Sequence, residues 1–326
     1  MAKRFFTTLL TAGALALSVF GTTASAETIR LAHTAAVSHA HHEAATVFAE
    51  NVAKRTGGKV KVEVYPAGEL GDQPALAEQI TLGALDMAVV SLGNLAMYDK
   101  RLNAMTAPFL FSDYAHAHRT IDNFVMGWMN EGLAKQDALG LDYGFRQTTT
   151  KNVPINTADD LKGLKIRVPP STGLLAAFDA VGANTQKIAY SELYTSLKQG
   201  VVVGEENPVF TILADSLYET QNELAMTNHY FDCQVLLVNK MFFDGLAPDV
   251  QKVIREEAVK AQNLTRVRIS EGESAVVEEL KKKGMHVTTP DRASFVAKMK
   301  PAYEKVGKLA GEKEMDKLLT AVKANQ

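Results

Sequence analysis

Two arginines stand in segments that are otherwise typical of buried strands. Arg167 lies within the apolar run Ile166-Arg167-Val168, directly before a Pro-Pro stop, and Arg146 ends another expected strand. A guanidinium stays protonated in proteins, so a buried arginine needs an anion, and the sequence around Arg167 offers no obvious acidic partner. A ligand carboxylate would accept two parallel hydrogen bonds from it. The pair predicts an anion cradle; the alternative for Arg167 is an edge strand with the side chain in solvent.

A second group of residues suited to chemistry consists of histidines near the start of the chain. His39 and His42 are three residues apart and could share a helix face, with His41 between them, to bind a metal ion. No Cys, Asp or Glu stands at ligand spacing beside them, so we favour hydrogen bonding and expect neither a metal nor a cofactor. His33 is more informative because it ends the first expected strand, and ligands of open α/β sheets bind beyond such strand ends.

Sequence signatures of catalysis are scarce. The chain has no G-x-S-x-G elbow, P-loop, G-x-G-x-x-G or H-E-x-x-H motif. Glu205 and Glu206 could form an acid/base pair, but neighbours in a strand point to opposite faces. Cys233 is the only cysteine, which excludes an intramolecular disulfide, and we expect it to be buried in a strand as a small apolar residue. These observations favour a protein that is not an enzyme.

The elements that must position these residues form two series. In the first, strands at 28–32, 60–64 and 85–92 alternate with two helices. This β-α-β-α-β order predicts a mostly parallel sheet with helices on both sides. In the second, expected strands at 141–146, 164–168, 185–188 and 201–203 surround helices at 173–181 and 191–198. The stretch between Leu141 and Asp159 lacks a strong helix, so a domain crossing is expected there. The predicted fold class is α/β with two lobes.

A long helix is expected near the end of the chain. From Pro248 no proline occurs until Pro290, and apolar residues keep a helical spacing over the first half of this segment. An unbroken helix to Lys283 would span about 54 Å, enough to brace both lobes. Gly272 raises the alternative of two shorter helices.

Composition and the N-terminal segment narrow the class of protein. With 326 residues, a formal net charge of −2 and 7% aromatic residues, the chain has no basic field for nucleic acid. Lys3 and Arg4 precede an apolar run at 5–20, and Ala24-Ser25-Ala26 fits a signal-peptidase site. The run is shorter than the roughly 20 residues that cross a bilayer. We therefore expect 1–26 to be a cleaved signal peptide, which leaves an exported protein with a net charge of −4.

Several motifs resemble those of one family. They are DLKGLKIRVP (160–169), SELYTSLKQGVV (191–202), ENP (206–208), YPAGELG (65–71), PFLF (108–111) and TNH (227–229). Together, and in this order over essentially the whole mature chain, they are similar to the solute-binding proteins of TRAP (tripartite ATP-independent periplasmic) transporters. One departure is Val203-Gly204-Glu205, where the family usually has Asp-Gly-Gln.

The resemblance implies a two-lobed periplasmic-binding-protein fold that closes over an organic acid. In the family, the arginine that matches Arg167 clamps the ligand carboxylate and the asparagine that matches Asn207 orients it. Arg146 matches a second arginine that many members have, and Tyr190 matches a position that is often an aromatic wall of the pocket. His33, Gln73, Ser91 and Gln234 match loop positions that vary with the ligand. The expected lobes are 27–144 plus 233–272 and 145–232 plus 273–326.

The expected function is capture of a small organic acid, either a sugar acid such as a uronate or a C4-dicarboxylate, for a TRAP membrane permease. The protein would be a periplasmic monomer. The neutral hydrogen-bonding groups of His33, Gln73 and Ser91 favour a hydroxylated acid as the ligand. Two alternatives stay open: an exported metal-dependent enzyme that uses His39, His41 and His42, and an extracytoplasmic ligand-sensing subunit.

Overall fold

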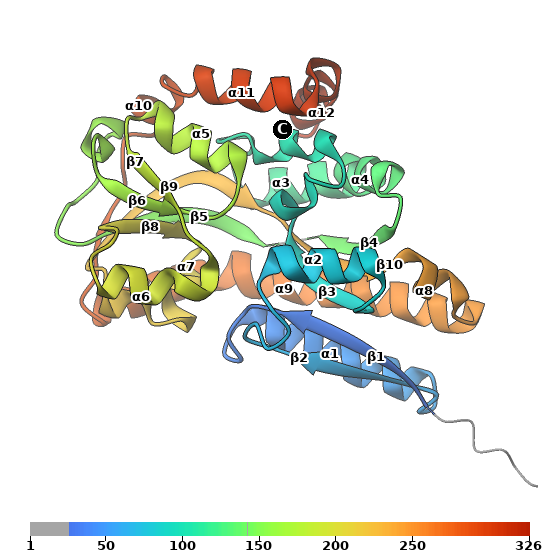
Figure 1. Cartoon of the computed structure of the whole chain (residues 1–326). Helices are drawn as coiled ribbons and strands as arrows, with labels where there is room; N and C mark the ends of the chain where they lie inside the picture. Colours follow the sequence, from blue (N-terminus) through green and yellow to red (C-terminus); the bar gives the residue numbers. More distant parts are fainter. Residues whose placement is uncertain (1–25, 142) are drawn as a thin grey trace, which may run out of the picture.

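The computed structural model describes residues 26–141 and 143–326, which form two β-sheets side by side with helices around them (Figure 1). The expected signal segment lies, except for Ala26, outside the described residues. The first sheet has the order β2-β1-β3-β10-β4, with β1 (Glu27–His33), β2 (Val60–Tyr65), β3 (Met87–Ser91), β4 (Gln136–Leu141) and β10 (Gln234–Asn239). The second has the order β11-β9-β5-β8-β6-β7, with β5 (Gly144–Thr150), β6 (Lys165–Val168), β7 (Asn184–Lys187), β8 (Gly204–Asn207), β9 (Glu223–Asp232) and β11 (His286–Thr288).

Helices cover both sheets. Those in the first part of the chain and directly after β10 are α1 (Ala40–Arg55), α2 (Gln73–Leu82), α3 (Tyr114–Thr120), α4 (Met126–Gly132) and α8 (Lys240–Gly245). Those near the second sheet are α5 (Thr172–Ala180), α6 (Leu193–Lys198), α7 (Val209–Ala214) and α10 (Arg292–Val296). Short helices are η1 (Leu92–Leu95), η2 (Lys100–Thr106), η3 (Ile121–Val125), η4 (Ala158–Leu161), η5 (Tyr190–Glu192) and η6 (Leu217–Glu219). Among the described residues, no helix is both long and apolar enough to span a membrane.

The two-lobed α/β class is confirmed, although the sheets are mixed where the sequence predicted mostly parallel ones. β1 pairs in parallel with β2 and β3, as the β-α-β-α-β order requires, but β10 runs antiparallel to β3 and β4. In the second sheet β5 runs antiparallel to β8 and β9. The cause is the chain path: it passes between the sheets from β4 to β5 and from β9 to β10, so these strands enter their sheets from the shared boundary.

Two expected strands are placed differently. The segment 201–203 is not a strand: it forms the loop before β8, with Val201 half exposed and Val202 buried in the core. The strand is instead formed by Gly204–Asn207, whose polar side chains are buried and hydrogen-bonded to neighbouring residues. The expected strand 141–146 covers the end of β4 and the start of β5. Cys233 is buried, as expected, but lies between β9 and β10 and not within a strand.

A single helix, α9 (Pro248–Lys282), runs along both sheets and continues through Gly272, so the alternative of two shorter helices is wrong. It packs against α1 beside the first sheet and against α7 and β11 beside the second. A Cβ atom at Gly272 would lie 2.9 Å from Cζ of Phe210 on α7. The glycine therefore costs helix propensity but lets α7 pack closely on the helix.

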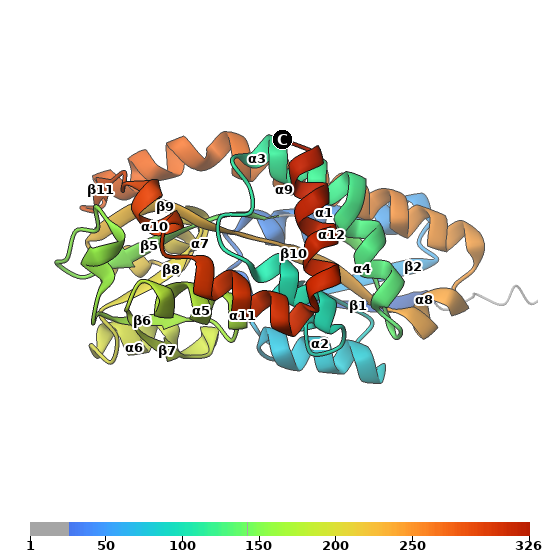
Figure 2. The ribbon, with the colours of Figure 1, turned by 90° about the horizontal axis from the view of Figure 1, so that it is seen from above.

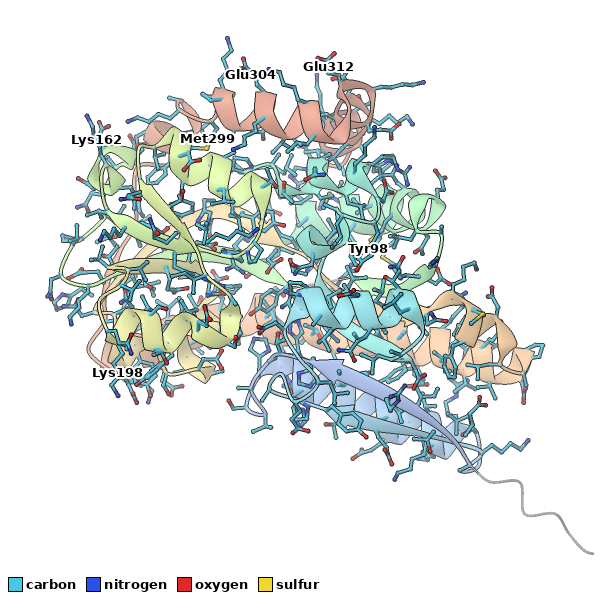
Figure 3. The ribbon with its side chains drawn as sticks, in the orientation of Figure 1. Tyr98, Lys162, Lys198, Met299, Glu304 and Glu312 are labelled. Carbon is cyan, nitrogen blue, oxygen red and sulfur yellow. The ribbon has the colours of Figure 1, made fainter. Side chains whose placement is uncertain are left out.

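The C-terminal helices α11 (Lys300–Ala310) and α12 (Glu312–Ala324) lie across the molecule when it is seen from above (Figure 2). Met315, Leu318 and Val322 of α12 belong to the apolar core of the first lobe, although the expected lobe boundaries assign 273–326 to the second. α11 contacts both α5 and η2, so it bridges the two parts. Charged side chains such as Lys162, Lys198, Glu304 and Glu312 point outward into solvent (Figure 3).

Candidate ligand-binding site between the two sheets

A cavity of about 290 Å³ has walls from both sheets. Its lining includes all eight residues that the sequence analysis singled out: His33, Gln73, Ser91, Arg146, Arg167, Tyr190, Asn207 and Gln234. They come from β1, β3 and α2 on one side and from β5, β6, β8 and η5 on the other, with Gln234 at the start of β10. The two sheets therefore meet at one cavity of a size suited to a small ligand.

Arg167 is the side chain whose charge is least compensated in this cavity. It lies in β6 between β7 and β8, and only 1% of it is exposed, so the solvent-exposed alternative is wrong. Its Nε donates to the backbone oxygen of Ile188 at 3.0 Å, while Nη1 has no hydrogen-bond partner in the described chain. Burial lowers the pKa of Arg167 to about 10, against the attraction of Glu206, so the group is still charged at neutral pH.

The hydroxyl of Ser171 is a second buried polar group in the same wall without a hydrogen-bond partner among the described residues. It follows the Pro-Pro stop of β6 and was not singled out from the sequence. Buried polar groups normally find a partner. Together with Nη1 of Arg167 it offers two donors to a ligand that enters the cavity.

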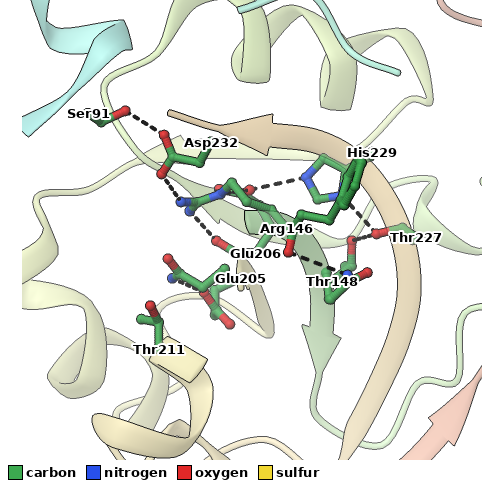
Figure 4. A network of polar contacts seen from close by, with 12 residues as sticks. Ser91, Arg146, Thr148, Glu205, Glu206, Thr211, Thr227, His229 and Asp232 are labelled. Carbon is green, nitrogen blue, oxygen red and sulfur yellow. Dashed lines mark hydrogen bonds and ion pairs between the residues drawn. The ribbon is translucent and has the colours of Figure 1, made fainter. Parts of the chain in front are cut away.

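Arg146 has a different environment. Its Nε and Nη2 both bond the carboxylate of Glu206, and its Nη1 donates to Oδ2 of Asp232 at 2.9 Å (Figure 4). His229 also contacts Oε2 of Glu206 at 3.1 Å. Burial acts to lower the pKa of Arg146, but Glu206 and Asp232 outweigh it and raise that pKa. The expected cradle of two available arginines is therefore reduced to one, because the charge of Arg146 is already matched.

β8 places Asn207 in the wall of the cavity and buries Glu205 and Glu206 beside it. Glu206 faces Arg146, whereas the carboxylate of Glu205 accepts from Thr149 Oγ1 at 2.8 Å and from Asn207 Nδ2 at 2.5 Å. Burial acts to raise the pKa of Glu206, but Arg146 and His229 lower it below its ordinary value. Burial and the neighbouring Glu206 raise the pKa of Glu205 to about 7.

The wall from the first sheet offers neutral hydrogen-bonding groups. Gln73 donates to Thr34 Oγ1 and accepts from the backbone N–H of Ser91 at 2.7 Å. Ser91 and Gln234 both donate to Asp232. Burial lowers the pKa of His33 to about 4, so this histidine is neutral at physiological pH. No lysine or arginine of the first sheet is among the described lining residues.

The histidine cluster is used for hydrogen bonding. His39 is the N-cap of α1, where its Nδ1 accepts from the backbone N–H of His41 at 3.1 Å. Nε2 of His39 lies 3.1 Å from the hydroxyl of Tyr143, and His42 Nδ1 lies 3.2 Å from His33 Nε2. Within residues 26–141 and 143–326, no three His, Cys, Asp or Glu side chains are grouped so that they could hold a metal ion. Nothing in this geometry favours the metal-enzyme alternative.

Several lining residues were missed by the sequence analysis. Among them, Asp215 accepts a hydrogen bond from the hydroxyl of the predicted Tyr190, and Tyr143 contacts Thr211 on α7. Asp72 precedes α2 and accepts from Ser191 Oγ at 2.9 Å, a hydrogen bond across the two sides of the cavity mouth. These contacts join residues far apart in sequence, and no local pattern marks them. Only the helix-start signal at Asp72 could have drawn attention to one of them.

Two α/β lobes with a cavity between their sheets, lined by a buried arginine that has no carboxylate partner in the described chain, are the arrangement of a two-lobed binding protein. The chain belongs to the bacterial extracellular solute-binding protein family 7, DctP, whose model matches residues 31–309. This family comprises solute-binding proteins of TRAP transporters, so the resemblance seen in the sequence is confirmed.

Three relatives illustrate the similarity. The sialic acid-binding periplasmic protein SiaP of Vibrio cholerae serotype O1 is 30% identical over 95% of this chain and 97% of its own. A TRAP periplasmic solute-binding protein from Sulfitobacter sp. NAS-14.1 with bound β-D-galacturonate has a TM-score of 0.87 and 29% identity, covering 91% of this chain and 100% of that one. One from Shewanella oneidensis with bound succinate has a TM-score of 0.86 and 26% identity, covering 91% and 99%.

Proposed function

We propose that this protein is a periplasmic binding protein that captures a small hydroxylated organic acid through Arg167 and delivers it to a TRAP membrane permease. The observation that carries the proposal is the buried guanidinium of Arg167, which lines the cavity with an unpartnered Nη1 and has no carboxylate bonded to it within the described chain. A ligand carboxylate would supply the missing anion and form a charge-assisted pair in a dry site.

The charges of the lining favour a sugar acid over a C4-dicarboxylate. Beyond Arg167, the lining offers amides, hydroxyls and neutral histidines, and three carboxylates: Asp72, Asp215 and Asp232. Hydroxyl groups donate to such carboxylates, whereas a second ligand carboxylate would be repelled and would find no further uncompensated cation. A polyhydroxylated monocarboxylate therefore fits this lining, with its carboxylate at Arg167 and its hydroxyl groups at the aspartates. The relatives that bind sialic acid and galacturonate support this class, and the relative with succinate makes a dicarboxylate the alternative.

Export, closure of the lobes and delivery to the permease complete the proposed function. The basic and apolar start of the sequence supports export and removal of 1–26. Lobes made of 27–144 plus 233–272 and of 145–232 plus 273–326 would close over the ligand, with α12 packed against the first lobe. The monomer would then present the closed form to the membrane subunits of the permease.

The test is calorimetric titration of the wild-type protein and of Arg167→Ala with N-acetylneuraminate, D-galacturonate and succinate, after a thermal-shift screen with the same acids. A ligand in excess raises the unfolding midpoint by mass action. We expect Arg167→Ala to weaken binding of the cognate acid by about 2–5 kcal/mol, the range for loss of one partner of a buried charge pair. Arg268→Ala, which removes an exposed arginine paired with Glu43, is the matched control and should bind as the wild type does. Unchanged affinity in Arg167→Ala would refute the proposal, as would a midpoint raised by neutral sugars alone.

A further inference from the structure

Glu205 and Glu206 are adjacent, fully buried glutamates with unequal partners. Glu206 is held by the guanidinium of Arg146 and by His229. The hydrogen bonds of Glu205 come from neutral donors only, Thr149 and Asn207, and no basic side chain forms an ion pair with it in the described part of the chain. A buried carboxylate without a paired cation is costly unless a positive charge lies nearby or it takes up a proton.

Among the described residues, Arg167 is the buried cation beside Glu205 that no carboxylate bonds: β6 is parallel to β8 with Ile166 opposite Gly204, so Arg167 and Glu205 are neighbours across this strand pair. The charged and titratable groups that act on Glu205 are Glu206 of its own strand, Arg146 from β5, Arg167 from β6 and Tyr190 from η5. Arg146 is already matched by Glu206 and Asp232. In the ligand-free site the hydrogen bonds from Thr149 and Asn207 and the charge of Arg167 all favour the ionised form of Glu205, and Arg167 is the one of these groups that the proposed ligand would use.

We propose that Glu205 and the ligand carboxylate compete for the charge of Arg167, so that binding of the acid anion is accompanied by uptake of one proton by Glu205. This inference rests on the proposed function. The proton comes from solvent and converts the Glu205 carboxylate into a carboxylic acid, and no other bond forms or breaks. The neutral acid retains oxygen lone pairs for the hydrogens of Thr149 and Asn207, so the wall of the site keeps its hydrogen bonds.

The pH range of the effect follows from the groups around the site. Burial and Glu206 raise the pKa of Glu205 to about 7 in the free protein, and a bound carboxylate on Arg167 would raise it further. Below that pKa Glu205 is protonated with and without ligand, and binding takes up no proton. Above that pKa, Glu205 is ionised in the free protein and protonated in the complex. The affinity for the acid therefore falls as pH rises, by up to about tenfold per pH unit. Burial lowers the pKa values of His33 and His39 to about 4 and about 3, so these histidines are neutral throughout.

The experiment is calorimetric titration between about pH 6 and pH 9 in buffers of different ionisation enthalpy, which counts the protons taken up per ligand. The probe is whichever of N-acetylneuraminate, D-galacturonate and succinate raises the unfolding midpoint most. We expect uptake to approach one proton in the wild type near pH 8 and to be absent in Glu205→Gln, whose affinity should no longer vary with pH. The glutamine side chain can face its oxygen to Asn207 and its amide hydrogens to Thr149, so the site geometry is retained.

Two further variants separate this inference from effects on folding. Glu257→Gln changes a buried glutamate on α9 that is paired with Arg55 and Lys260 and does not line the cavity, so its proton uptake should equal that of the wild type. Thr149→Val removes a hydrogen bond that favours the charged form of Glu205 and so raises its pKa, and the fall in affinity should therefore begin at a higher pH. Binding without proton uptake, or uptake that persists in Glu205→Gln, overturns this inference alone. Failure of all three acids to bind overturns the proposed function as well.

Discussion

At the scale of single residues, Arg146 and Arg167 show how one residue type serves two purposes in the same cavity. Both are buried charges that lie in neighbouring parts of the second sheet. Arg146 is bonded to two carboxylates, and its removal would leave Glu206 and Asp232 without a cation. Arg167 donates to one backbone oxygen and has an unpartnered Nη1, so its removal breaks no ion pair in the described chain. The first residue is expected to stabilise the fold and the second to bind.

This contrast predicts losses of stability of different size for two alanine variants in urea denaturation. Arg146→Ala should lower the free energy of unfolding by about 3–5 kcal/mol, because breaking a buried ion pair leaves an uncompensated charge. Arg167→Ala should lower it by less than about 1 kcal/mol, because a costly unpaired cation is removed together with its packing. Equal losses in the two variants would contradict the assignment of roles.

At the scale of elements, the first turn of α5 is positioned by its contact with η2. Gly173 lies at this crossing, and a Cβ atom there would be 2.1 Å from the backbone oxygen of Thr106 and 2.2 Å from its Oγ1. Neither atom can move without shifting η2. Because α5 follows the Ser171 corner of the cavity, this close approach also sets the wall next to Arg167.

Substitution of two helical glycines tests the contact. Gly173→Ala should destabilise the protein by about 1–3 kcal/mol, the usual cost of overpacking a well-packed position. Gly127→Ala in α4 is the matched control, since its Cβ would meet no atom within 4 Å and the residue is exposed. That change should stabilise the protein by up to about 1 kcal/mol through helix propensity. Urea denaturation measures both, and a stable Gly173→Ala would show that α5 is free to move away from η2.

At the scale of the whole molecule, the two lobes touch beside the cavity. Ser191 of η5 donates to Asp72 directly before α2, and Tyr143 links His39 of the first lobe with Thr211 of the second. Closure of lobes around a ligand is the usual motion of two-lobed binding proteins. The contact between Ser191 and Asp72 is therefore expected to favour the closed form without touching the clamp at Arg167.

Ser191→Ala is expected to speed release of the bound acid by up to about fivefold, the effect of losing one hydrogen bond worth about 1 kcal/mol. The association rate should change less, because mutations within one interface act mostly on dissociation. Stopped-flow displacement with a competing acid measures the release rate. Ser270→Ala, whose hydroxyl bonds only a backbone oxygen within α9, should release at the wild-type rate, and identical rates for Ser191→Ala would argue against a closing contact.

The sequence by itself determined the local elements and the residues that gather at the cavity. Alternation of apolar and polar residues predicted β1 and β2, and the run from Pro248 predicted α9, because periodicity reports which side chains a single element buries. Arg167 stood out because its neighbours are apolar. The family motifs directed attention to Asn207, Tyr190, Gln73 and the other lining positions.

Only the tertiary structure decided how the charges in the cavity are matched. Arg146 and Asp232 are 86 positions apart, and their pairing depends on β5 lying beside β9. The same sheet order buries Glu205 and makes 204–207 a strand in place of the more apolar 201–203. Local spacing carries no information on which distant strands become neighbours. For that reason the sequence located both arginines, but only the fold determined which of them has no carboxylate partner in the described chain.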